Sequence, residues 1–91
     1  MNRPDRIEGK LREHLGATHV EVIDESHLHA GHVGAQSGGG HFRVTVVSDR
    51  FEGLSTLQSQ RLVFQALAEE MQTEIHALSM STFTVNEWSA R

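Results

Sequence analysis

The chain has 91 residues, a formal net charge of −4 and no cysteine. A chain of this length has room for one modest hydrophobic core, so we expect a single domain over residues 1–91. The lack of cysteine excludes a disulfide framework and any thiolate metal site built from this chain alone. The acidic balance argues against a general attraction to nucleic acid, because only eight Lys and Arg side chains are present.

Membrane proteins and the common enzyme classes are both disfavoured by the sequence. No apolar run approaches the roughly 18 residues of a membrane span, and the start MNRPDRIEGK is too polar for a signal peptide. The sequence has no cysteine nucleophile, no GxSxG motif and no P-loop. Carboxylates such as Asp24, Glu25, Glu69 and Glu70 are expected to be solvated charges. We therefore expect a cytoplasmic protein that is not an enzyme.

The first half of the chain predicts a helix and two strands. Residues 4–16, PDRIEGKLREHLG, place apolar side chains at i, i+4 and i+8 between an early proline and a final glycine, a pattern typical of a helix. Residues 18–25, THVEVIDE, and 41–48, HFRVTVVS, are rich in β-branched residues and partly alternate. They predict two strands of a hairpin with a long loop.

The third quarter of the chain predicts one long helix. After a turn at 49–54, Ser55 and Gln58 form a capping box, and the helical pattern continues to about Thr73. We expect this helix to pack across the sheet. Its expected core face consists of Leu57, Phe64, Leu67, Ala68 and Met71.

The last elements are a third strand and a short C-terminal helix. Residues 74–83 alternate and predict a strand. By parity, His76 shares one face with Leu78 and Met80, while Ile75, Ala77 and Phe83 share the other. On this pattern alone, the simplest interpretation of His76 is a half-buried histidine bonded to a carbonyl. Thr84 and Glu87 form a second capping box, from which Trp88 folds back on the core.

Four of the seven histidines lie in one glycine-rich segment, residues 26–41. Consecutive glycines in this segment favour a mobile loop, because each loses much backbone freedom on ordering. Neutral imidazoles bind zinc, iron, copper and nickel, so these histidines are candidate ligands by proximity: His27, His29, His32 and His41. Their spacing matches no zinc motif. The alternative is a solvated loop that only adds solubility and pH-dependent charge.

Four blocks of sequence together resemble the BolA family. They are DESHLHAGH (24–32), HFRVTVVSDRFEGLS (41–55), RLVFQALAEE (61–70) and IHALSMSTFTVNEW (75–88). The resemblance extends over about residues 5–88. It implies an α+β domain of the class II KH-like αββαβ fold, with a three-stranded sheet packed against helices and a short C-terminal helix, in agreement with the predicted element order.

The resemblance also implies a partnership with a monothiol glutaredoxin, in which the two proteins hold a bridging 2Fe-2S cluster. In such complexes the glutaredoxin and its glutathione supply thiolates. The BolA-like protein supplies a histidine of the IHAL block and a Cys or His of the loop between the first two strands. On this chain these ligands are His76 and, best matched, His29, with His32 and His41 in reserve. The isolated chain is expected to carry no cofactor and to be a monomer or weak dimer.

Histidine ligands have two consequences for such a cluster. Replacing thiolates by neutral imidazoles removes negative charge and raises the reduction potential, as in Rieske centres. A histidine must also lose its proton before it binds iron, so we expect acidification below about pH 6 to release the cluster.

A second role implied by the resemblance is that of a bacterial transcriptional regulator of cell morphology, stress response and biofilm growth. Many relatives carry Arg-His-Arg early in the long helix, where this chain has Ser59, Gln60 and Arg61. Each lost cation removes a possible phosphate contact, which leaves Arg50 and Arg61 as candidate DNA-contacting residues. The chain also lacks the GxxG loop between helices by which KH modules hold nucleic acid. The glutaredoxin adaptor, with a role in iron–sulfur homeostasis and stress response, is thus the leading hypothesis, and the DNA-binding regulator is the alternative.

Overall fold

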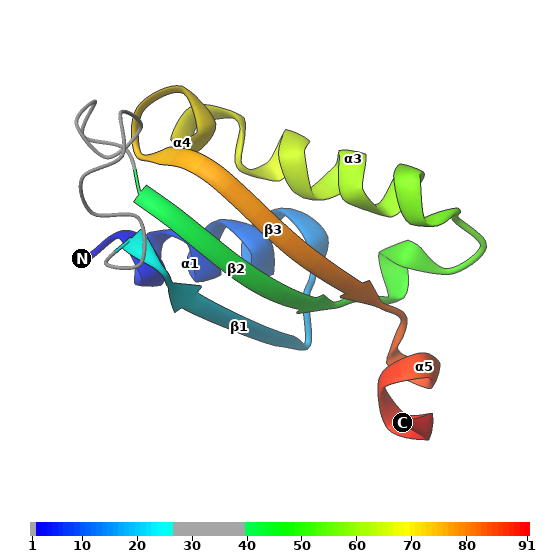
Figure 1. Cartoon of the computed structure of the whole chain (residues 1–91). Coiled ribbons are helices and arrows are strands. Elements are labelled where there is room, and N and C mark those ends of the chain that lie inside the picture. Colours follow the sequence, from blue (N-terminus) through cyan, green and yellow to red (C-terminus); the bar gives the residue numbers. More distant parts are fainter. Residues whose placement is uncertain (1, 27–39) are drawn as a thin grey trace.

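The computed structural model describes residues 2–26 and 40–91, which form a three-stranded sheet with helices on one face (Figure 1). Strand β1 (His19–Asp24) is antiparallel to the central strand β2 (Gly40–Val47). Strand β3 (Ile75–Phe83) lies on the other side of β2 and pairs with it in parallel. The predicted hairpin and third strand are confirmed.

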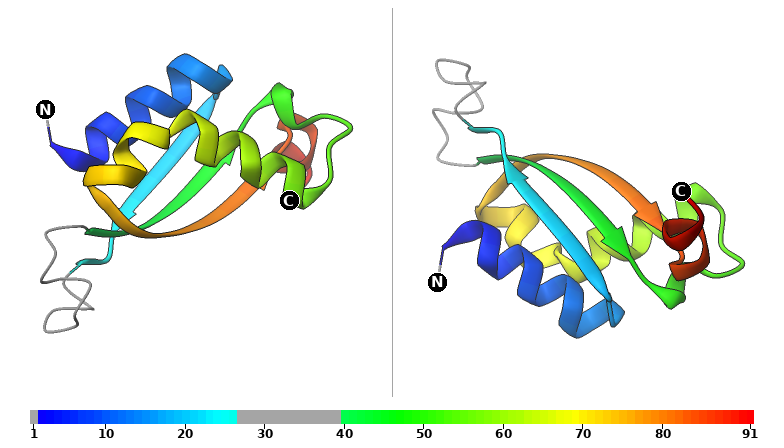
Figure 2. Two further views of the ribbon diagram at one scale, coloured as in Figure 1. Left: turned by 90° about the horizontal axis from the view of Figure 1, so that it is seen from above. Right: turned by 90° about the horizontal axis from the view of Figure 1, so that it is seen from below.

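The helices gather on one side of this sheet. Helix α1 (Arg3–Leu15) precedes β1, and α3 (Thr56–Ala66) and α4 (Ala68–Thr73) join β2 to β3 after the short 3-10 turn η2 (Asp49–Phe51). The two views of Figure 2 show α1, α3 and α4 on the same face. Helix α5 (Val85–Ala90) lies at the opposite end of the sheet from the first residues of β2 and β3. The α+β class and the αββαβ order are thus confirmed. Among the described helices, none has the length and apolar character needed to cross a membrane.

One hydrophobic core fills the space between the sheet and the helices. The central strand contributes Phe42, Val44 and Val46, which are at most 2 % exposed because β2 has a strand on each side and helices above it. Burying each of these side chains contributes about 1.5–3 kcal/mol relative to exposure. The same core cluster includes three residues of α1 and three from α3 and the residue after it: Ile7, Leu11, Leu15, Val63, Ala66 and Leu67.

The predicted helix ends are confirmed by their caps. Gly16 ends α1 in the left-handed conformation, with φ of 58°, which a glycine adopts without steric cost. Ser55 and Gln58 form a reciprocal capping box at the start of α3. Thr84 and Glu87 do the same for α5. Local side-chain chemistry therefore determines where these elements begin and end.

The predicted long helix differs from the structure in two respects. The helix is interrupted at Leu67, whose φ and ψ of −105° and 19° separate α3 from α4. Its predicted core face is wrong at three positions, because Leu57, Phe64 and Ala68 are exposed. The buried side consists of Ser59, Val63, Ala66, Leu67 and Glu70, with Leu62 and Met71 packed against the core.

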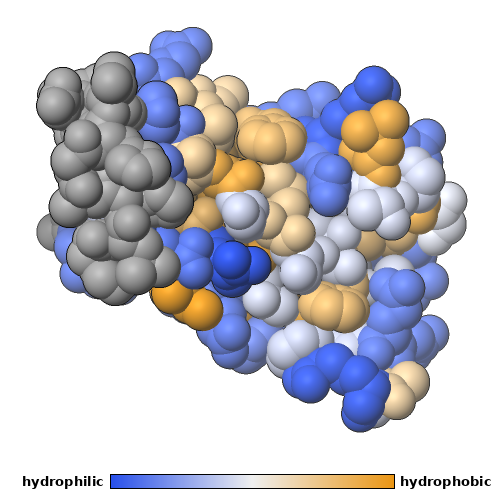
Figure 3. All heavy atoms as spheres, in the orientation of Figure 1, coloured by the Kyte–Doolittle hydropathy of each residue, from blue (hydrophilic) through white to orange (hydrophobic). Residues whose placement is uncertain are grey.

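The face of the sheet opposite the helices is largely polar. Along β2, Arg43 and Thr45 alternate with the buried residues and therefore lie on this open face, with Ser79 and Ser81 as their neighbours on β3. Figure 3 shows pale and blue spheres over much of this side, with an apolar area in the upper middle of the view. The open face is therefore compatible with exposure to solvent.

Candidate functional site: two histidines where β2 and β3 begin

The parallel pairing of β2 and β3 brings two histidines together that are far apart in sequence. Both strands begin at the same end of the sheet, where Gly40 pairs with Ile75 and His41 with Ala77. The imidazole rings of His41 and His76 are 5.2 Å apart between centroids and tilted by 47°. His41 is half-buried and His76 is exposed. His76 therefore faces solvent, beside a His41 ring whose Nε2 is buried.

A register shift determines where His76 lies. Between Gly40 and His41, the pairing advances by one residue on β2 and by two on β3, so His76 is an extra residue, as in a β-bulge. Ile75 is consequently buried at 4 % exposure, while Leu78 and Met80 pack against the core. The prediction that His76 shares a face with Leu78 and Met80 is wrong, as is its half-buried interpretation, because the bulge changes the alternation.

The main chain of His41 is held by the residues at the end of β1. The Glu25 N–H donates to the His41 carbonyl at 2.8 Å, and the His41 N–H donates to Ser26 Oγ at 3.0 Å. The Ser26 N–H in turn donates to Asp24 Oδ1 at 2.9 Å, which is an Asx turn. Arg43 Nε lies 3.2 Å from Glu25 Oε2 on the surface beside this network. These bonds connect the end of β1 to the start of β2, on either side of residues 27–39, which lie outside the described residues.

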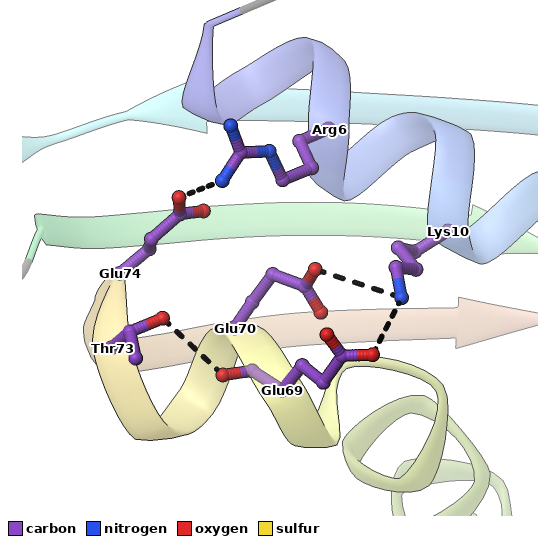
Figure 4. Close-up of polar contacts among 6 residues, drawn as sticks. All are labelled: Arg6, Lys10, Glu69, Glu70, Thr73 and Glu74. Atoms are coloured by element: carbon purple, nitrogen blue, oxygen red, sulfur yellow. Dashed lines mark hydrogen bonds and ion pairs between the residues drawn. The ribbon is translucent and has the colours of Figure 1, made fainter.

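On the helix side, ion pairs connect α1 to α4 and to the residue after it (Figure 4). Arg6 pairs with Glu74, whose backbone carbonyl accepts the Gly40 N–H at 2.9 Å. Lys10 Nζ lies 3.3 Å from Glu69 Oε1 and 3.8 Å from Glu70 Oε2.

These ion pairs line a hollow of about 440 Å³ between the helices. Glu70 is 4 % exposed, so the prediction that it is a solvated charge is wrong. Its carboxylate is instead buried beside Lys10.

The predicted site residues are distributed over different parts of the molecule. His76 and the reserve ligand His41 are adjacent, whereas His27, His29 and His32 lie outside the described residues. Both residues predicted to contact DNA, Arg50 and Arg61, are exposed and lie between β2 and β3 in the chain. Arg50 is in η2, where its guanidinium lies 3.5 Å from the His14 carbonyl, and Arg61 is in α3.

The two histidines fit an iron site whose ligands come from more than one molecule better than a site built from this chain alone. Two imidazoles are suitable ligands for iron and other borderline metals. Within residues 2–26 and 40–91, no group of three or more His, Cys, Asp or Glu side chains is placed to hold a metal ion. The described part of the chain thus offers two ligands, and the remainder would come from outside it.

Reasoning from sequence missed Ser26 and Glu25 as parts of this site. A local signal was present in Asp24, because an Asp side chain often accepts a hydrogen bond from the backbone N–H two residues on. The contact of Ser26 with His41, 15 residues later, depends on the strand pairing and had no sequence signal of its own.

Comparison with known proteins agrees with this architecture. A family model described as BolA-like protein matches residues 11–87. The DNA-binding transcriptional regulator BolA of Escherichia coli strain K12 is 44% identical over 84 residues, which cover 92% of this chain and 77% of that protein. BolA-like protein 1 of Homo sapiens is 48% identical over 82 residues, covering 90% of this chain and 58% of that protein. The solved BolA domain of SufE1 from Arabidopsis thaliana has a TM-score of 0.82 and 37% identity, with 96% of each chain covered.

The fold and the site define a small α+β domain in which an exposed His76 lies beside a half-buried His41, where two parallel strands begin. The chain belongs to the BolA family, because the family model and the relatives cover most of its length. The resemblance seen in four blocks of the sequence is thereby confirmed. The relatives' names describe a regulator and a BolA-like protein rather than an enzyme.

Proposed function

We propose that this protein is a BolA-type adaptor that binds a monothiol glutaredoxin and shares a 2Fe-2S cluster with it and with glutathione. The observation that carries the proposal is the pair of imidazole rings 5.2 Å apart at an accessible end of the sheet. A chain without cysteine that offers two histidines needs a partner to supply thiolates. When bound, a 2Fe-2S cluster supplies one-electron redox chemistry.

His76 is the first ligand in this proposal, and His29, His32 and His41 are the candidates for the second. His41 is favoured by its position beside His76. His29 is favoured by the family resemblance and lies outside the described residues. Substitution of each histidine by alanine distinguishes them, because only a ligand is required for the spectrum of the cluster.

The test is anaerobic reconstitution of the full chain with a monothiol glutaredoxin and glutathione, followed by visible circular dichroism. We expect His76→Ala to abolish the cluster spectrum that appears only when this chain is present, and one of His41→Ala and His29→Ala to do the same or to change it strongly. His14→Ala is the matched control, because His14 is an exposed histidine in the last turn of α1. An unchanged spectrum for His76→Ala would contradict the proposal.

A second candidate function is DNA binding, which the name of the E. coli relative supports. Arg50 and Arg61 are the residues we propose for phosphate contacts. If they serve this role, the affinity for promoter DNA falls as the salt concentration rises. Replacing either by alanine makes the negative slope of log K against log salt less steep by about 0.9. Arg91→Ala is the control for a general loss of charge. Binding that is absent or independent of salt would exclude this function.

A further inference from the structure

The end of the β1–β2 ladder departs from regular strand pairing at Ser26. In an antiparallel pair of the hydrogen-bonded kind, two residues exchange both of their backbone bonds. Glu25 and His41 make only the first of these, from the Glu25 N–H to the His41 carbonyl. The acceptor for the His41 N–H is the Ser26 hydroxyl instead of a backbone carbonyl. A side chain thus completes the ladder just where β1 has ended.

Because the Ser26 hydroxyl replaces a backbone carbonyl as acceptor, the strand can end without leaving the His41 N–H unpaired. Strand β1 ends at Asp24, yet both backbone polar groups of His41 keep a partner. Asp24 holds the Ser26 backbone, which limits where the hydroxyl can lie. On the other side, the bond from Gly40 to Glu74 ties the start of β2 to the residue before β3. His41 is therefore fixed from the β1 side by Ser26 and from the β3 side through Gly40.

We propose that Ser26 is a positioning residue, whose hydroxyl holds His41 at its place beside His76. The geometric part of this inference is independent of any metal, whereas its consequence for a cluster rests on the proposed function. Metal and catalytic sites depend on supporting hydrogen bonds that keep their side chains in place, so loosening the His41 backbone should loosen the pair.

The first experiment uses the chain alone and needs no cluster. In Ser26→Ala the amide of His41 should exchange with solvent about tenfold faster than in the wild type, because its acceptor is gone. The Val44 amide, in the middle of β2, should exchange at an unchanged rate. The nuclear Overhauser effect between the His41 and His76 ring protons should weaken or vanish. Ser26→Thr keeps a hydroxyl and should restore both signals.

Two further variants control this measurement. Ser81→Ala removes an exposed serine hydroxyl from β3, away from Ser26, and should leave the exchange of His41 unchanged. Asp24→Ala keeps the hydroxyl but frees its backbone, so its effect should lie between those of wild type and Ser26→Ala. Asp24→Ala also tests the inference if Ser26→Ala fails to fold. A His41 exchange rate in Ser26→Ala, or in Asp24→Ala where only that variant folds, within about twofold of the Ser81→Ala value would overturn it.

The second experiment measures the consequence for the cluster. In the reconstituted complex with glutaredoxin and glutathione, Ser26→Ala should shorten the lifetime of the cluster signal several-fold, and Ser26→Thr should restore it. If no cluster forms with the wild type, the proposed function fails while the exchange result still stands. If Ser26→Ala exchanges faster but keeps both the ring contact and the cluster lifetime, the hydroxyl only completes the strand pairing and the positioning role is wrong.

Discussion

Trp88 stacks on His19, with ring centroids 4.7 Å apart and ring planes inclined by 25°. The same indole lies 5.3 Å from the ring of Phe83. His19, Val47 and Phe83 are direct neighbours across the three strands, so they form one row on the open face. Val47 is only 1 % exposed, although this face carries neither α1 nor α3. Helix α5 therefore covers this end of the open face with the Trp88 ring.

Removing this aromatic contact should destabilise the domain. We expect Trp88→Ala to lower the free energy of unfolding by about 2 kcal/mol, since a half-buried indole and two ring contacts are lost. Trp88→Phe keeps a ring and should lose about half as much. The measurement is urea unfolding followed by far-UV circular dichroism, which does not depend on tryptophan fluorescence. Leu57→Ala, which truncates a large side chain that is 57 % exposed, is the control. Equal midpoints for Trp88→Ala and Leu57→Ala would contradict the role given to Trp88.

The two sides of α3 show why sequence alone assigned its core face incorrectly. Leu57, Phe64 and Ala68 recur at helical spacing, and so do Ser59, Val63 and Ala66. The first set contains the more apolar residues, so hydrophobicity favours it. The second set is buried in the structure, because the position of the helix over the sheet, rather than its own composition, decides which side faces inward.

The observed burial along α3 predicts that truncating two adjacent residues lowers the free energy of unfolding by unequal amounts. Val63 is fully buried, so Val63→Ala should lower the free energy of unfolding by about 2 kcal/mol. Phe64 is larger but 41 % exposed, so Phe64→Ala should cost less than about 1 kcal/mol. Thermal and urea unfolding of the two variants side by side measure the difference. A larger loss for Phe64→Ala would mean that the helix presents its other side to the sheet.

Lys10 and Glu70 form a further pair whose importance follows from burial. The side chain of Glu70 is 5 % exposed and that of Lys10 is 26 % exposed, with Nζ 3.8 Å from Oε2 (Figure 4). A buried carboxylate that loses its cation is left without compensation, so Lys10→Met should cost about 2–3 kcal/mol of stability.

Adding Glu70→Gln to Lys10→Met removes the uncompensated charge and should recover about half of this loss. Arg12→Met is the matched control, because Arg12 pairs with Glu8 on the exposed surface of the same helix and such pairs contribute about 0–1 kcal/mol. The free energies of unfolding of the wild type, Lys10→Met, Glu70→Gln and the double variant form a double-mutant cycle for Lys10 and Glu70. Additive losses in this cycle would show that the two side chains do not interact.

The candidate site was predictable only in part, for a physical reason. His76 was found through the IHAL block of the family resemblance, and the helix caps were found from local side-chain patterns. The pairing of His76 with His41 depends on β2 and β3 being parallel neighbours and on the bulge that makes His76 an extra residue. The strand pairing and the bulge both depend on contacts between distant parts of the chain, and local periodicity does not encode such contacts.

The proposed cluster should respond to acid in a defined direction. An imidazole binds iron only in its neutral form, and a histidine ordinarily has a pKa of about 6.5. Protons compete with iron for imidazole ligands, so the affinity for the cluster decreases as the pH falls. We expect the visible circular dichroism of the complex with glutaredoxin to be stable between about pH 7 and 8 and to decline below about pH 6.

The control for this acid response separates ligand protonation from unfolding. Far-UV circular dichroism of the same sample should remain native at the pH where the cluster signal is lost, because the side chains that fill the core, such as Phe42, Val44 and Val46, are apolar. A second control is the glutaredoxin reconstituted with glutathione in the absence of this chain, where no histidine of this chain can be a ligand. If both complexes lose their clusters at the same pH, the thiolates rather than the histidines of this chain determine the acid response.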